Sequence, residues 1–154
     1  MADFQAASGD LAAAEATYRR GLELEPTHAR LLRGLGFTLL QAGRYQEALA
    51  LFERHPVPWM RSLGLALAHH SLGHDVESRS ALEALIAYGA TNGYQLAEAY
   101  AWRGELDPAF TWLARAVETR DSGLPYLKFD PLLAKLHADP RWRPLLRRLN
   151  LPVD

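Results

Sequence analysis

Four glycines recur along this 154-residue chain, each lying after one helix-forming stretch and before another. Gly9, Gly43, Gly73 and Gly104 follow one another at nearly even intervals. Glycine suits the positive φ of a tight turn at the end of a helix. Self-similarity with a period of roughly 20–50 residues is typical of repeat proteins, in which each unit buries its apolar face against the next. The even spacing therefore predicts an array of helical hairpins.

The residues that follow each glycine repeat as well. The fifth residue after the glycine is small, and the ninth is large. The small residues are Ala14, Ala48, Ser78 and Ala109, and the large ones are Tyr18, Phe52, Leu82 and Leu113. A small residue lets the second helix of a hairpin approach the first, and the large residue one turn later fills the groove between neighbouring helices.

The first helix of each hairpin carries a pair of residues of its own. These pairs are Leu35-Gly36, Leu65-Ala66 and Leu96-Ala97. In the third repeat a rival register, Leu63-Gly64-Leu67, competes with Leu65-Ala66-His69. We prefer the latter because it keeps the spacing to Gly73.

Together these features resemble the tetratricopeptide repeat (TPR), whose pattern is W-x2-L-G-x2-Y, then A-x3-F, then P. The resemblance covers roughly residues 2 to 121, where the Trp of the pattern is missing and the first repeat has only a short first helix. It implies an all-α fold, a right-handed α-α superhelix with its repeats in 1–121, the first one incomplete. Residues 122–154 are expected to form a C-terminal cap of two short helices, packed on the last repeat within the same domain.

We expect helices over 2–8, 10–24, 28–41, 44–54, 58–71, 75–88, 92–103 and 107–119, and two more starting at Asp130-Pro131 and Asp139-Pro140. Thr27 and Thr91 are the expected N-caps, and Asp107-Pro108 places a capping acid before a proline at the first helical position. The segment His55-Pro56-Val57-Pro58 should cut the helix over 44–54 short, because proline forbids a helix there.

The segment from Tyr100 to Pro152 looks like the closing segment of TPR arrays in bacterial multidomain regulators. That resemblance implies an accessory or regulatory module of a larger bacterial protein. TPR modules bind a protein or a peptide segment, and we expect the same partners here.

The residues favour neither catalysis nor metal binding. The chain has no cysteine, no serine in a G-x-S-x-G turn and no glycine loop that cradles phosphate. His70 and His74 have the spacing of two zinc ligands on one helix face, but Gly73 should end that helix between them. We therefore expect no enzyme activity, no cofactor and no metal.

Location and the remaining partners follow from composition. No apolar run is long enough to cross a bilayer, and the lack of cysteine fits a reducing cytosol, although the periplasm stays open. Nucleic acid is disfavoured, because the net charge is −1 and the last helix fits a cap with an apolar inner face. Its arginines are Arg141, Arg143, Arg147 and Arg148, and its inner face is Trp142, Leu145, Leu146 and Leu149. Self-association into a homo-oligomer is an alternative, through an apolar edge at Phe4, Leu11 and Tyr18.

In the TPR fold the first helix of each repeat lines the concave face, so the resemblance implies a peptide-binding groove there. The residues at these positions are Arg30, Arg33, Phe37, Gln41, Met60, Leu63, Leu67, His70, Tyr94, Glu98 and Trp102. We expect the arginines to anchor a peptide by charge and the apolar residues to contact it. Under the rival register, Leu63 and Leu67 belong to the core instead.

Overall fold

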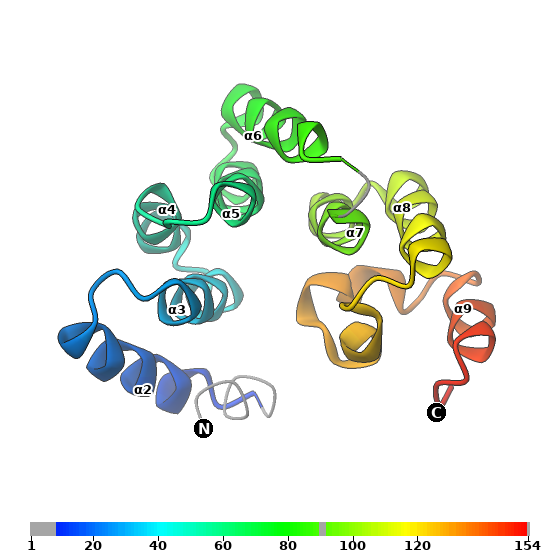
Figure 1. Ribbon diagram of the computed structural model, residues 1–154, viewed down its shortest axis with the longest axis horizontal. Coiled ribbons are helices and arrows are strands. Elements are labelled where there is room, and N and C mark those ends of the chain that lie inside the picture. The colour runs from blue at the N-terminus through cyan, green and yellow to red at the C-terminus, as the bar shows by residue number, and fades with distance from the viewer. Residues whose placement is uncertain (1–8, 90–91, 154) are drawn as a thin grey trace. The chain divides into compact units, whose positions relative to one another are not determined.

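The computed structural model describes residues 9–89 and 92–153, and all regular elements within these ranges are helices (Figure 1). The prediction of an all-α repeat fold is therefore confirmed. Contacts between residues divide the chain into two compact units, 1–87 and 88–154. The last hairpin and the C-terminal cap thus group together, whereas the sequence placed its division after residue 121. That the whole chain is one domain stays a prediction.

The first unit is built of two layers of helices. Its helices are α2 (Leu11–Leu24), α3 (Ala29–Gln41), α4 (Tyr45–Glu53), α5 (Pro58–Ser71) and α6 (Asp75–Ala87). Within this unit α3 and α5 lie side by side in one layer, and α2, α4 and α6 form the other (Figure 1). The short helix predicted over 2–8 lies outside the described residues.

The turns between paired helices use the repeating glycines as predicted. Gly9, Gly43, Gly73 and Gly104 have φ between +74° and +82°, a conformation that other residues adopt only at a cost. The small residues after them, Ala14, Ala48, Ser78 and Ala109, are completely buried, and the large ones are buried too. Ser78 also donates a hydrogen bond of 2.8 Å to the Ala66 carbonyl, which joins α6 to α5. The spacing anchored on the glycines is thereby confirmed.

Phe52 is the residue that fixes how α3 and α5 approach α4. Its ring is completely buried and lies between two glycines of the neighbouring layer. A Cβ atom would come within 2.6 Å of the ring at Gly36 and within 2.1 Å at Gly64. Only glycine leaves room for the ring on both sides. As expected, α4 is short and ends before Pro56, and Pro58 starts α5.

Two of the predicted helix caps are wrong. Helix α3 is capped by His28, one residue after Thr27, and the His28 imidazole accepts from the Leu31 N–H at 3.4 Å. Helix α8 (Leu106–Thr119) begins before the predicted cap, directly after Glu105. The reason is the tight Gly104 turn, in which the Glu105 N–H donates to the Tyr100 carbonyl at 2.9 Å. Asp107 therefore lies inside the first turn. The third expected cap, Thr91, lies outside the described residues.

The second unit consists of α7 (Gly93–Arg103), α8 and the cap. The cap contains two 3₁₀ helices, η2 (Leu124–Phe129) and η3 (Pro131–Leu136), and then α9 (Trp142–Arg148). The sequence missed η2, because a short 3₁₀ helix with proline in second place does not show the periodicity of an α-helix. The predicted inner face of the last helix is confirmed: Trp142 and Leu146 are buried, and Leu145 and Leu149 pack against the same core.

Tyr94 ties the cap to the last hairpin. Its hydroxyl donates to Asp130 Oδ2 at 2.9 Å, and its backbone N–H donates to Asp121 Oδ2 at 3.2 Å. The ring lies against Gly123, where a Cβ atom would come within 2.5 Å of it. Burial and the neighbouring Asp130 carboxylate raise the pKa of the Tyr94 hydroxyl, so that it stays protonated as a donor. Hydrogen bonds of Tyr94 within an apolar core therefore hold the cap on the last hairpin.

Candidate protein-binding face

The burial pattern of α3 and α5 decides which of their residues face outward. The buried residues of α3 are Leu32, Leu35, Gly36, Thr38, Leu39 and Leu40. Those of α5 are Met60, Leu63, Gly64, Ala66, Leu67 and Ala68. The two sets have the same spacing. When the sequence of α5 is aligned with that of α3 so that Gly64 matches Gly36, each buried residue of α5 matches a buried residue of α3. Helix α5 therefore faces the core in the same way as α3.

This alignment of Gly64 with Gly36 is the rival register of the third repeat. The register preferred from the sequence placed Leu65-Ala66 on Leu35-Gly36, and for the buried face of α5 it is wrong. The two alignments differ by two positions, which turn an α-helix by about 200°, so the error exchanges the inner face for the outer one.

Four predicted groove residues are corrected as a result. Leu63 and Leu67 are completely buried and belong to the core, as does Met60. His70 lies half-buried, outside the stripe that the alignment of Gly64 with Gly36 places outward.

The corrected alignment identifies a different stripe on α5. Pro58, Arg61, Leu65 and His69 take the places of Arg30, Arg33, Phe37 and Gln41. All eight residues are exposed or half-buried, with the arginines exposed. Because α3 and α5 are neighbours in one layer, their two stripes adjoin. We call this surface the α3–α5 face. Its α3 half is where the sequence placed it, and its α5 half was missed.

In the fourth repeat the chain itself covers the predicted groove positions. Tyr94 lies beneath the cap and keeps only 2% of its surface exposed, and Glu98 is also buried. Trp102 is half-buried, and its carbonyl accepts a hydrogen bond from Lys135 Nζ of η3. The ammonium group of Lys135 lies 6.0 Å from the centre of the Trp102 ring. The cap therefore occupies the surface on α7 where a ligand was predicted.

On the α3 half, the side chains differ in how firmly they are held. Phe37 packs its ring 5.5 Å from the Phe52 ring, so part of it belongs to the core. Gln41 donates from Nε2 to the Phe37 carbonyl at 3.3 Å. On the α5 half, Arg61 donates from Nε to the His55 carbonyl at 2.9 Å. The partner of Arg61 is neutral, so the guanidinium keeps its positive charge at the surface.

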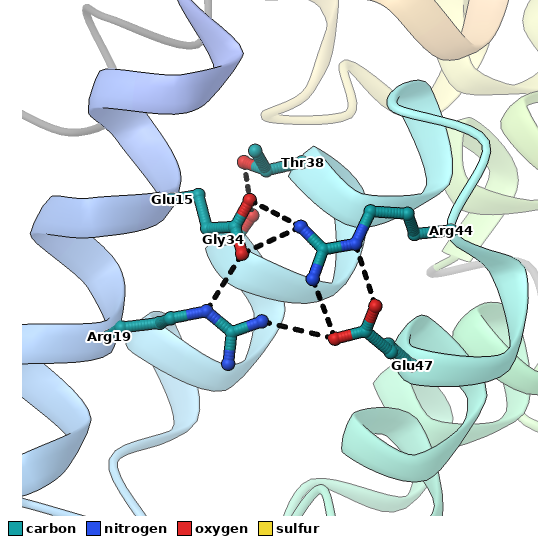
Figure 2. A network of polar contacts seen from close by, with 6 residues as sticks. All are labelled: Glu15, Arg19, Gly34, Thr38, Arg44 and Glu47. Carbon is teal, nitrogen blue, oxygen red and sulfur yellow. Dashed lines mark hydrogen bonds and ion pairs between the residues drawn. The ribbon is translucent and has the colours of Figure 1, made fainter.

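The opposite layer of the first unit carries a network of ion pairs (Figure 2). Arg44 binds Glu15 at 2.7 Å and Glu47 at 2.6 Å, and Arg19 binds the same two carboxylates at 2.7 and 3.1 Å. Hydrogen bonds from Arg19 and then Arg44 lower the pKa of the Glu15 carboxyl. Of these contacts, the i,i+4 pair of Glu15 and Arg19 and the i,i+3 pair of Arg44 and Glu47 have a signal in the sequence. The network joins α2 to α4.

An open depression of about 290 Å³ lies beside this network. It is lined by Arg19, Leu39, Glu47, Ala50, Leu51 and Arg54. None of the predicted groove residues belongs to it. Arg19 and Glu47 on its rim are already engaged in ion pairs, so it is a poorer surface for a partner than the α3–α5 face.

The remaining sequence candidates are placed as follows. His74 lies beside His69 rather than His70, with 3.2 Å between the two Nδ1 atoms. Arg141 binds Asp107 and Asp139, each at 2.8 Å, and its hydrogen bonds lower the pKa of Asp139 to about 2.

One residue of the apolar edge predicted for self-association is corrected, and self-association itself stays a prediction. Tyr18 is buried between α2 and α3, where its ring lies against Gly34. Phe4 lies outside the described residues. No helix in 9–89 or 92–153 is long and apolar enough to cross a membrane.

Comparison with known proteins supports the repeat assignment. Residues 5–57 match the model of the tetratricopeptide repeat family. The predicted resemblance is confirmed for this segment, which contains α2, α3 and α4. The chain is also similar to the cellulose synthase operon protein C of Xanthomonas axonopodis pv. citri (strain 306), with 48% identity over 56 residues. The match covers 36% of this chain and 4% of that protein. TPR repeats indicate a scaffold for protein–protein interaction.

Proposed function

We propose that this chain is a non-catalytic protein-binding module, an accessory part of a larger bacterial protein, and that the partner lies across the α3–α5 face. The observation that carries the proposal is the pair of adjoining stripes on α3 and α5. At aligned positions, each stripe carries an arginine, then an apolar residue and then a polar residue. The TPR match supports the role in protein binding, and the partial similarity to a much longer bacterial protein supports a place within a larger protein.

The chemistry of the face suits a peptide or an extended segment. Phe37 and Leu65 stand at equivalent positions of the two helices and give it an apolar centre. Arg33 and Arg61 stand one turn before them and give it charge. Apolar contacts supply most of the affinity in such recognition, and the charged residues fix the direction of the segment.

The proposal is tested by selecting ligands from a random library of short peptides displayed on phage. Each selected peptide is then measured against two variants of the chain. Leu65→Glu places a charge in the centre of the face, and Val76→Glu places the same charge on α6, where Val76 is exposed. We expect Leu65→Glu to weaken binding at least about tenfold, while Val76→Glu leaves it unchanged. Failure to select any peptide, or peptides indifferent to Leu65→Glu, would refute the proposal.

A further inference from the structure

The charged residues of the first unit are divided between its two layers. Helices α3 and α5 contain three arginines, Arg30, Arg33 and Arg61, and neither helix contains an aspartate or a glutamate. The rest of residues 10–87 contains nine acidic and five basic residues, a net charge of −4. The net charge of −1 for the whole chain therefore conceals a positive layer of +3 beside a negative remainder.

Of the five arginines that residues 10–87 contain outside α3 and α5, two are held in an ion-pair network. On the α2 and α4 side, Arg19 and Arg44 are held by Glu15 and Glu47 at 2.6–3.1 Å (Figure 2). On the α3–α5 face, by contrast, neither Arg33 nor Arg61 has a carboxylate within ion-pairing distance in the part of the chain that the structure describes. An arginine left with its charge at an exposed surface is available to a carboxylate of another molecule.

From this division of charge we infer that the partner on the α3–α5 face is an acidic segment of another polypeptide, with apolar residues between its carboxylates. The inference rests on the proposed function and specifies its ligand. Aspartate or glutamate side chains bind Arg33 and Arg61, and the apolar residues of the segment contact Phe37 and Leu65. Planar guanidinium groups favour carboxylates, because two N–H donors meet two oxygens.

Nucleic acid is the other polyanion that arginines bind, and the layout of the unit argues against it. The apolar centre between the arginines offers no contact to a phosphate backbone. A long polyanion would also extend beyond the small positive face and meet the negative remainder of the unit. A short acidic segment matches both the charge and the size of the face.

The test uses the peptides selected from the random library on the whole chain. We expect them to be enriched in aspartate and glutamate relative to the unselected library. The double variant Arg33→Glu/Arg61→Glu should weaken their binding about tenfold or more. The matched control is Arg20→Glu/Arg79→Glu, which makes the same change in net charge at exposed arginines of the other layer. The control should bind within about twofold of the wild type, and far-UV circular dichroism should show that both variants are folded.

A charge exchange completes the test. Replacing the acidic residues of each peptide by lysine should abolish binding to the wild type and restore it to Arg33→Glu/Arg61→Glu. Peptides that respond to Leu65→Glu but not to the double variant would overturn this inference and leave the proposed function standing. An equal loss with the control variant would also overturn it. If a short single-stranded DNA competes with the peptides for the wild type but does not bind the double variant, the ligand class would be nucleic acid and the inference of an acidic segment would be wrong.

Discussion

Substituting alanine for Gly64 tests the packing of α5 against Phe52. In the structure, Gly64 points at Phe52, and a Cβ atom there would lie 2.1 Å from the ring. The added methyl group would therefore overlap the ring, and we expect it to lower the free energy of unfolding.

The magnitude follows from two opposing contributions. Overpacking a core costs about 1–3 kcal/mol, and this site belongs at the upper end, because Gly36 also lies close to the Phe52 ring and restricts its movement. Replacing glycine by alanine inside a helix gains about 1 kcal/mol. The net expectation for Gly64→Ala is a loss of about 2 kcal/mol.

The assay is urea unfolding followed by far-UV circular dichroism. With an m value of about 1–2 kcal/mol/M, the expected loss lowers the midpoint by about 1–2 M urea. Gly93→Ala is the matched control, since a Cβ atom at Gly93 would meet its nearest neighbour, Ala116, at an ordinary 3.5 Å. This variant should be neutral or slightly stabilised.

A double-mutant cycle assigns the effect to the ring. Phe52→Leu shortens the side chain with which the new methyl group of Gly64→Ala would clash. The double variant should therefore lose at least about 0.5 kcal/mol less free energy of unfolding than the two single variants lose in sum. A Gly64→Ala variant as stable as the wild type or more stable would refute the packing of α5 described above. So would strict additivity of the two substitutions.

Two further predictions concern the cap and the opposite layer. Tyr94→Phe removes a hydrogen bond to a carboxylate and should lower the free energy of unfolding by about 1.5–2 kcal/mol. The amide of Leu132 donates to the same Asp130 carboxylate at 2.9 Å, so its hydrogen should exchange faster in this variant. Unchanged exchange would contradict the role of Tyr94 in anchoring the cap. The pKa of Glu15 is lowered from 4.5 in the folded state, so its contribution is complete above about pH 4.5 and is lost as the pH falls through the folded pKa. Between about pH 7 and about pH 3, the urea midpoint should therefore fall further for the wild type than for Glu15→Gln, and equal falls would count against the network.

Much of the fold was predictable because the repeat is local. A glycine with positive φ, a small residue five positions later and a large one nine positions later are tied to the geometry of one hairpin, so the sequence alone places them. The caps at His28 and Glu105 were missed because they depend on how each turn closes. The 3₁₀ helix η2 was missed because its packing on the last hairpin, rather than a period in the sequence, holds it in place.

The exposed stripe was predictable on α3 and not on α5. Both registers of α5 place leucines at helical spacing, and the choice between them depends on which residues the neighbouring helices bury. A signal was nevertheless present. Leu63, Gly64 and Leu67 repeat the order and spacing of Leu35, Gly36 and Leu39. Gly36 and Gly64, which both lie close to the Phe52 ring, form a pattern that spans two repeats, and alignment on the turn glycines alone does not reveal it.

The separation of charge between the two layers also bears on the kinetics of encounter. A unit that is positive on one side and negative on the other has an electric dipole across its layers. An acidic segment that diffuses toward it is repelled by the α2, α4 and α6 side and attracted to the α3–α5 side, so it arrives already turned toward the correct surface. Added salt should then slow association much more than it speeds dissociation.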